Sequence, residues 1–244
     1  MAEIVKSFIV LLNKATLLQR LISAAALGAL FLLTSNWVFA EGESGAEQLR
    51  QFVRVSKTAE GEFIQQQLRA PRANEPQDKG LKVIRQTQGR FVFQRPGRFI
   101  WDTQKPYEQK LIADGKQLIL WDKDLNQATF RAAGQALAAT PAAILFGENS
   151  LDQHFDLVEG EDRLGMKWVA LSPKKNPNVK NANDLPYTKI SVGMANALPK
   201  ALELIDGLGS VVLVTLDKIQ LNVTLPANRF NFTPPPGAEV LRLN

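Results

Sequence analysis

Apolar residues recur at helical spacing where the mixed-charge part of the chain begins. Ser44 and Glu47 form a capping box, in which the hydroxyl and the carboxylate each satisfy a backbone N–H at a helix start. Beyond them, apolar residues recur every three or four positions up to about Lys57, which predicts an amphipathic helix. Its apolar stripe consists of Ala46, Leu49, Phe52 and Val53. In the simplest interpretation this stripe covers a sheet.

From about residue 61 the period changes toward two, which is typical of β-strands. Phe91 and Phe93 share one face of a strand predicted over 89–94. Phe99 and Trp101 share one face of the next strand. Further strands are predicted over 63–68, 108–113, 117–121, 155–159, 166–171, 187–192, 201–204, 211–216 and 219–225. The pattern therefore predicts a meander of antiparallel strands.

A short second helix is predicted between residues 140 and 147. Thr140 suits the N-cap, Pro141 suits the first helical position, and Gly147 supplies the stop. The residues between them are apolar all round, so this segment must bury most of its surface. They are Ala142, Ala143, Ile144, Leu145 and Phe146. The chain thus reads as one mainly β domain with helical interruptions, in the α+β class.

The loop over 172–184 differs from the other connections because it is long, basic and without apolar periodicity. It carries Lys174, Lys175 and Lys180 among Asn and Pro residues. This composition predicts a solvated hairpin tip. The functional alternative is a contact with an acidic partner or an anionic membrane surface.

The first forty residues are typical of a cleavable export signal. Basic residues precede an apolar run over 21–33, and Val38 and Ala40 form a V-x-A exit. The alternative is a transmembrane anchor, but the run of about 13 residues is shorter than the roughly 20 that a spanning helix needs. We therefore expect a signal peptide over 1–40, cleaved near Ala40, and a single soluble domain over 41–244.

Composition removes several classes of function. The chain has no cysteine, so it has no disulfide, no thiolate metal ligand and no cysteine that could be lipidated next to the cleavage site. Setting aside Glu3 and the three basic residues of the signal leaves 26 basic and 23 acidic residues in the mature part. Because these charges are interspersed and match no recognition motif, we expect no nucleic-acid binding.

The polar residues do not assemble into a catalytic motif. His154 is the single histidine and sits at a strand entry without a nucleophile motif, so a structural role is favoured. Carboxylates such as Asp122 and Asp124 fall in turn-like stretches, and nothing in their spacing selects a glycosidase pair. No phosphate-binding, dinucleotide-binding or metal-binding spacing occurs. We expect no catalytic residue, no metal and no cofactor.

A hydrophobic ligand fits the remaining pattern better. Helices with apolar faces accompany a sheet long enough to curl, and a half-closed barrel covered by helices can hold such a ligand. Several runs sharpen this reading, because together they resemble the outer-membrane lipoprotein carrier family LolA from about Gln48 to the end. They are Phe91 to Trp101 (FVFQRPGRFIW), Pro106, Gln109, Ala113-Asp114-Gly115, Leu120-Trp121, Thr140-Pro141 and Phe230 to Ala238 (FNFTPPPGA).

The resemblance implies an incomplete antiparallel β-barrel covered by a helical lid. It also implies a monomeric periplasmic carrier, not an enzyme, whose partners are acylated lipoproteins, an inner-membrane lipoprotein-releasing ABC transporter and an outer-membrane lipoprotein receptor. Arg95 matches the family arginine that bonds backbone carbonyls of the lid and holds the empty cavity shut. A surface cation beside Pro96 is the alternative reading of this residue.

Ten apolar residues are candidates for the cavity and its lid, with plain core packing as the alternative for each. The predicted cavity wall consists of Phe91, Phe93, Phe99 and Trp101, and the predicted lid of Leu49, Phe52, Val53, Ile144, Leu145 and Phe146. Two stretches, 69–86 and 172–184, are longer than the resemblance predicts. The rival functions are a binding module for another lipid or glycolipid and, from a different class, a secreted hydrolase.

Overall fold

A computed structural model describes residues 43–75, 80–132, 145, 151–174 and 187–243. Residues 43–244 form one compact unit, and the fold below is that of this unit. The signal peptide expected over 1–40 lies outside the described residues. So do Thr140, Pro141, Ile144 and Phe146 of the predicted second helix, and most of the basic loop.

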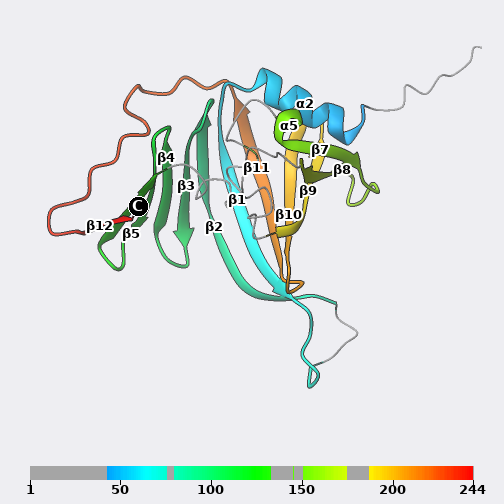
Figure 1. Cartoon of the computed structure of the whole chain (residues 1–244), viewed down its shortest axis with the longest axis horizontal. Coiled ribbons are helices and arrows are strands. Elements are labelled where there is room, and N and C mark those ends of the chain that lie inside the picture. Colours follow the sequence, from blue (N-terminus) through cyan, green and yellow to red (C-terminus); the bar gives the residue numbers. More distant parts are fainter. Residues whose placement is uncertain (1–42, 76–79, 133–144, 146–150, 175–186, 244) are drawn as a thin grey trace, which may run out of the picture. The chain divides into compact units, whose positions relative to one another are not determined.

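The described strands form one sheet of 12 strands (Figure 1). Their order across the sheet is β12-β6-β5-β4-β3-β2-β1-β11-β10-β9-β8-β7. The strands are β1 (Thr58–Arg69), β2 (Lys82–Gln94), β3 (Arg98–Lys105), β4 (Gln109–Asp114), β5 (Gln117–Asp122), β6 (Gln127–Ala132), β7 (Phe155–Glu159), β8 (Lys167–Pro173), β9 (Tyr187–Ala195), β10 (Leu198–Asp206), β11 (Val211–Leu221) and β12 (Glu239–Leu243).

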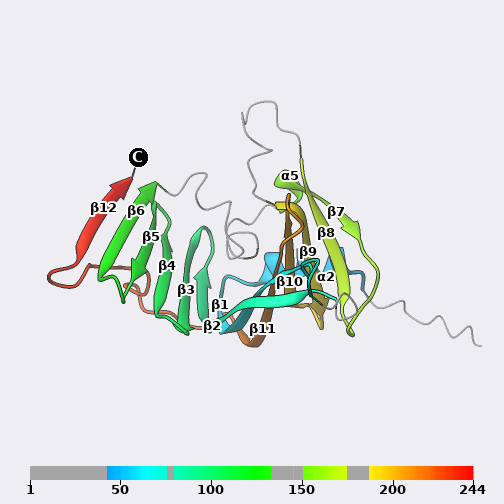
Figure 2. The same cartoon turned by 90° about the horizontal axis from the view of Figure 1, so that it is seen from below.

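The sheet is open, because β12 and β7 are its two outer strands and do not pair with each other. Figure 2 shows them at opposite edges, with the other strands curving between them. Neighbouring strands are antiparallel except β12, which pairs with β6 in parallel. The expected antiparallel arrangement is therefore wrong at this one edge, where the long connection after β11 brings the chain back along β6 in the same direction.

Two predicted strands near the C-terminus are a single strand. The segments 211–216 and 219–225 were predicted to be joined by a short polar turn at Asp217 and Lys218. In the structure β11 continues to Leu221. A register shift between Glu60 and Glu62 of β1 places two β11 residues opposite one β1 residue, so the pairing continues past Asp217. Residues 222–225 lie outside any strand.

Helix α2 (Gly45–Val55) confirms the predicted N-terminal helix. The backbone N–H of Glu47 donates to the Ser44 hydroxyl at 3.3 Å, as the capping box requires. The helix ends at Ser56, whose extended backbone leads directly into β1. It packs against β7, β8, β9 and β10. A short helix, α5 (Leu151–His154), precedes β7, and Leu145 is helical as well.

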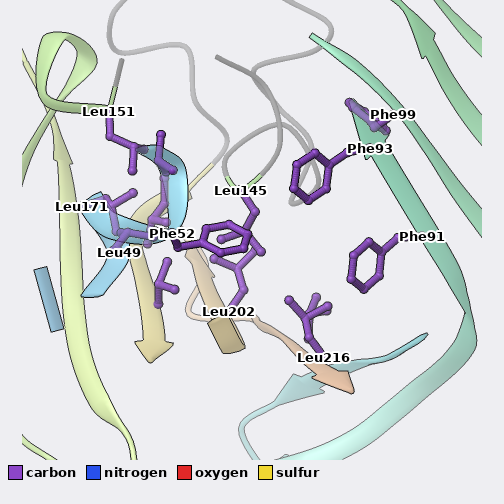
Figure 3. Packing of buried hydrophobic residues seen from close by; sticks show 14 of the residues in the cluster. Leu49, Phe52, Phe91, Phe93, Phe99, Leu145, Leu151, Leu171, Leu202 and Leu216 are labelled. Atoms are coloured by element: carbon purple, nitrogen blue, oxygen red, sulfur yellow. The ribbon is translucent and has the colours of Figure 1, made fainter. Parts of the chain in front are cut away.

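The sheet has two apolar faces. The inner face carries the larger cluster, which includes the apolar stripe of α2 and residues from most strands (Figure 3). The outer face of β3 to β6 carries a second cluster of Ile112, Ile119, Trp121, Ala128 and Phe130. Alternation along each strand explains the division, since successive side chains point to opposite faces.

Candidate functional site

Eight of the ten predicted cavity and lid residues lie in the buried cluster of the inner face. None of the eight is more than 8% exposed. Figure 3 shows Phe91 and Phe93 pointing from β2 toward Phe52 and Leu145. The eight are Leu49, Phe52 and Val53 of α2, Phe91 and Phe93 of β2, Phe99 and Trp101 of β3, and Leu145. The other two, Ile144 and Phe146, lie outside the described residues.

Aromatic rings dominate the middle of this cluster. The rings of Phe63 and Trp101 stack with centroids 3.8 Å apart, and Phe91 lies 6.1 Å from Trp101. Phe52 meets Phe93 edge-on at 6.2 Å, so an α2 side chain reaches the sheet directly. Phe63 was not among the predicted wall residues, and the alternation around it is broken because the apolar Ile64 follows it directly in β1.

Glycine at two positions makes room for an aromatic ring and for the backbone of a neighbouring strand. A Cβ on Gly61 would lie 2.6 Å from the ring of Phe91, its register partner on β2. A Cβ on Gly89 would lie 1.9 Å from the carbonyl oxygen of Asp102. Both positions therefore exclude a side chain, which lets β1, β2 and β3 approach closely under the aromatic cluster.

Arg95 joins the end of α2 to the chain at Leu145. Its Nε donates to the carbonyl oxygen of Ser56 at 3.2 Å, and its Nη2 donates to the carbonyl oxygen of Leu145 at 2.7 Å. The side chain is 9% exposed, and its guanidinium carbon lies 5.1 Å from the ring centroid of Phe93. The planar guanidinium suits this task because its donors point in fixed directions.

Burial lowers the pKa of the Arg95 guanidinium to about 10. The cause is loss of hydration, which disfavours the charged form. Arg95 still carries its charge at neutral pH, so a cation is held in a buried setting beside aromatic rings. The hydrogen bonds to the two carbonyls offset part of that cost.

A pocket of about 670 Å³ opens beside Arg95, at the C-terminal end of α2. Most of its described lining residues are polar or charged, unlike those of the aromatic cluster. The lining residues are Arg50, Val53, Arg54, Ser56, Lys57, Arg95, Leu151 and Asp152. The predicted wall residues Phe91, Phe93, Phe99 and Trp101 are not among these lining residues and lie in the buried cluster of the inner face.

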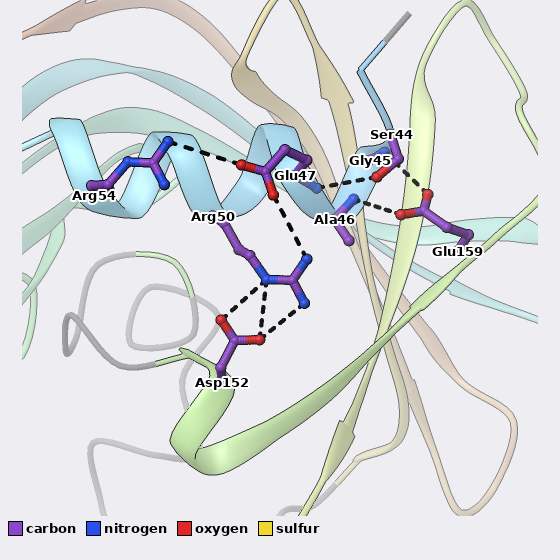
Figure 4. A network of polar contacts seen from close by, with 8 residues as sticks. All are labelled: Ser44, Gly45, Ala46, Glu47, Arg50, Arg54, Asp152 and Glu159. Carbon is purple, nitrogen blue, oxygen red and sulfur yellow. Dashed lines mark hydrogen bonds and ion pairs between the residues drawn. The ribbon is translucent and has the colours of Figure 1, made fainter. Parts of the chain in front are cut away.

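A separate polar network attaches α2 to the edge of the sheet that contains β7 (Figure 4). The backbone N–H groups of Gly45 and Ala46 donate to the carboxylate of Glu159 at 3.0 and 2.9 Å. Glu159 belongs to β7, so the helix N-terminus is capped from 114 residues away. A negative charge at this end also complements the helix dipole. Local sequence patterns carry no signal for such a cap.

One turn further along α2, Arg50 binds Asp152 of α5. Its Nε and Nη2 lie 3.0–3.2 Å from the Asp152 carboxylate, and this hydrogen bond raises the pKa of Arg50. The buried Gln48 adds a third attachment, because its Oε1 accepts from the backbone N–H of Ala197 at 3.0 Å. Helix α2 is thus fixed to the β7 side by several contacts and to the β2 side through Arg95.

Within the described residues, no group of three or more His, Asp or Glu side chains is placed to hold a metal ion. No described helix is long and apolar enough to span a bilayer.

Comparisons with known proteins agree with the sequence pattern. A family model described as "Outer membrane lipoprotein carrier protein LolA" matches residues 54–233. The chain is 41% identical over 222 residues to an outer-membrane lipoprotein carrier protein of Cupriavidus pinatubonensis, which covers 91% of this chain and 97% of that protein. It is 42% identical over 204 residues to one of Ralstonia nicotianae, with coverage of 83% and 90%.

A solved structure is similar in fold at low sequence identity. An uncharacterised conserved protein from Thermus thermophilus superposes with a TM-score of 0.50 and 13% identity, over 81% of this chain and 99% of that chain.

Proposed function

This chain belongs to the outer-membrane lipoprotein carrier family LolA, and from that premise we propose that it carries lipoproteins through the periplasm with their acyl chains held on the inner face of its sheet. It would take each lipoprotein from an inner-membrane ABC transporter and deliver it to an outer-membrane receptor. It would act as a monomer and without a catalytic step. Export would rely on a signal peptide over 1–40, and the carrier domain would comprise 41–244.

The need for such a carrier follows from the cost of exposing acyl chains to water. Burial of acyl chain stabilises by about 0.8 kcal/mol per CH₂ group, so a client with two or three long chains would face tens of kcal/mol in the periplasm. A sheet whose inner face presents apolar side chains can shield acyl chains from water, provided that the helices covering this face can move aside.

The observation that carries the proposal is the position of Arg95 over this apolar face. Its guanidinium bonds the carbonyls of Ser56 and Leu145, which belong to two segments far apart in sequence. We propose that α2 and the chain around Leu145 form the lid, and that Arg95 holds it shut when the carrier is empty. Phe91, Phe93, Phe99 and Trp101 would then line the space that opens.

The energetics of Arg95 support a lid that opens readily. Two hydrogen bonds from a charged group favour closure by about 1.5–3 kcal/mol each. The loss of hydration that lowers the pKa of Arg95 to about 10 opposes closure. The closed arrangement is therefore favoured by only a small net free energy. Acyl chains that enter the aromatic cluster can reverse this preference.

The decisive experiment is lipoprotein release from spheroplasts. Protein purified from the periplasmic fraction is added, and lipoproteins are sought in the soluble fraction as a one-to-one complex by size exclusion and immunoblotting. A protein of similar size without the fold is the control. Absence of any soluble lipoprotein would defeat the proposal. Mass spectrometry of the complex tests the rival, because bound lipid or glycolipid without lipoprotein would favour another binding module.

A further inference from the structure

An apolar row crosses the outer face at the end of the sheet where β1 and β2 extend beyond their neighbours. Ile205 pairs with Val211, Val211 pairs with Leu68, and Leu68 pairs with Val83, so the four residues lie side by side on β10, β11, β1 and β2. Directly opposed residues share a face. The adjacent positions Leu204 and Val212 face the inner cluster, which places the row on the outer face.

This row is open to solvent at its β2 end. Val83 is 50% exposed, and two aliphatic neighbours on the same hairpin, Ile84 and Leu81, are 50% and 48% exposed. On the adjacent β10–β11 turn, Leu208 is 93% exposed. Figure 1 shows the ends of these four strands together at the bottom of the view. Six residues, here the hairpin-end patch, are Leu68, Leu81, Val83, Ile84, Ile205 and Leu208. Val211, which joins the row on β11, is only 7% exposed and is not part of the patch.

Cations border the hairpin-end patch. Lys189, the register partner of Ile205, continues the row on β9. Lys82 and Arg85 lie on the other face of β2, because their register partners are Arg69 and Gln67, and Gln67 pairs with Val212 of the inner face. Lys189 and Arg85 are both exposed.

The carboxylates at this end are already engaged. Glu75 binds Arg69 and Lys82, which holds the pKa of its carboxyl well below the ordinary range. The Asp206 carboxylate accepts the backbone N–H groups of Leu208 and Ser210. The described ends of these strands therefore present aliphatic side chains with cations nearby on both faces of the sheet.

We infer that the hairpin-end patch docks on the surface of a lipid bilayer that carries anionic headgroups. Aliphatic side chains on a short hairpin can enter the interfacial region, and nearby cations gain from lipid phosphates and from the negative surface potential. Clustered exposed aliphatics commonly mark an interaction surface, and the cations on both faces of the hairpin end favour an anionic lipid surface over a neutral one. Such docking would bring the carrier to a membrane, an activity beyond the binding of acyl chains.

The test is co-flotation of the purified protein with lipid vesicles that contain no lipoprotein. We expect binding to vesicles of phosphatidylethanolamine with about one quarter phosphatidylglycerol, and weak binding to phosphatidylcholine alone. Because each basic residue near an anionic surface contributes about 1 kcal/mol, R85E with K189E should weaken binding at least about tenfold. V83S with I84S should weaken it about fivefold or more at unchanged charge.

The matched control is L125S with K116E, which alters an exposed leucine and an exposed lysine in other turns of the sheet and should leave binding unchanged. Equal binding to both vesicle types, no binding at low salt, or equal loss with the control variant would overturn the inference. Self-association that V83S with I84S abolishes would identify a second copy as the occupant instead. The spheroplast assay is independent, because it reports lipoprotein binding and not attachment to a vesicle.

Discussion

At the scale of single residues, Arg95 is unusual in being charged, nearly buried and bonded to backbone carbonyls of two segments. Its role could be proposed from the sequence only through the resemblance, since an arginine before a proline in a turn is ordinarily a surface cation. Burial could not be read from the local pattern, because it depends on α2 and Leu145 closing over the turn from elsewhere in the chain.

Replacement of Arg95 by leucine should weaken delivery more than loading. The empty closed state would lose two charge-assisted hydrogen bonds, so the free energy that expels the acyl chains on closure would fall. We expect Arg95→Leu to bind lipoprotein and to transfer it at least about tenfold more slowly. The measurement is transfer from the purified complex to outer-membrane vesicles.

Arg95→Lys is the matched variant, because it keeps the charge and loses the planar fork that spans both carbonyls. Its transfer rate should lie between those of the wild type and Arg95→Leu. Normal transfer by Arg95→Leu would contradict the proposed role.

The pH dependence of closure follows from the same residue. Burial lowers the pKa of Arg95 to about 10, so well below pH 10 the group is charged in both the folded and the unfolded chain. Its contribution to stability is therefore constant there. Above about pH 10 the folded state releases the proton before the unfolded chain does, so the cost of burying the charge decreases as pH rises.

We accordingly expect lid closure to be independent of pH between 6 and 9. Binding of a hydrophobic fluorescent dye to the empty carrier measures opening over this range, with Arg95→Leu as the open reference. A clear transition between pH 6 and 7 would assign closure to a group other than Arg95.

At the scale of elements, alternation predicted much of the sheet but not its connections. Phe91, Phe93 and Phe99 were expected to share a face, and the structure buries them in one cluster. Strands β6 and β12 were not predicted. All five residues of β12 are exposed, so no apolar alternation marks it. Its parallel pairing with β6 depends on a long return of the chain, which leaves no local signal.

The cap that Glu159 provides to α2 is another long-range contact that the local sequence does not predict. In the sequence it lies in a turn-like acidic stretch, and only the folded sheet brings it to the N-terminus of α2. The packing of α2 on the sheet was predictable from its apolar stripe, but the residues that fix its position were not.

Removal of the polar attachments on the β7 side should loosen α2 without unfolding the sheet. Glu159→Ala leaves Gly45 and Ala46 without their acceptor, and loss of a helix cap costs about 1 kcal/mol. Asp152→Asn weakens an exposed pair with Arg50 that contributes at most about 1 kcal/mol. The double variant should therefore speed amide hydrogen exchange in residues 45–55 several-fold.

The control is Glu108→Gln, which removes an exposed pair with Lys123 far from α2 in the sheet. Exchange in α2 should not change in this variant. Equal protection of α2 in the wild type and the double variant would show that apolar packing alone holds the helix.

At the scale of the whole compact unit, the two faces of the sheet are covered by different parts of the chain. Helix α2 covers part of the inner face, whereas the segment after β11 covers the outer cluster. Phe232 lies 5.7 Å from Trp121, and Ala238 packs on the same cluster. Phe230 is 3% exposed, with the Arg98 guanidinium 5.7 Å from its ring centroid. The outer cover thus consists of irregular chain, anchored by aromatic side chains.

This division predicts that the C-terminal segment contributes to stability mainly through its aromatic residues and little through β12. Phe230→Ala should lower the free energy of unfolding by about 3 kcal/mol, as is usual for a buried phenylalanine. Val240→Ala, in a strand whose residues are all exposed, should lower it by less than about 1 kcal/mol. Urea unfolding followed by tryptophan fluorescence measures both, and comparable losses would mean that β12 stabilises the unit as much as the aromatic anchors do.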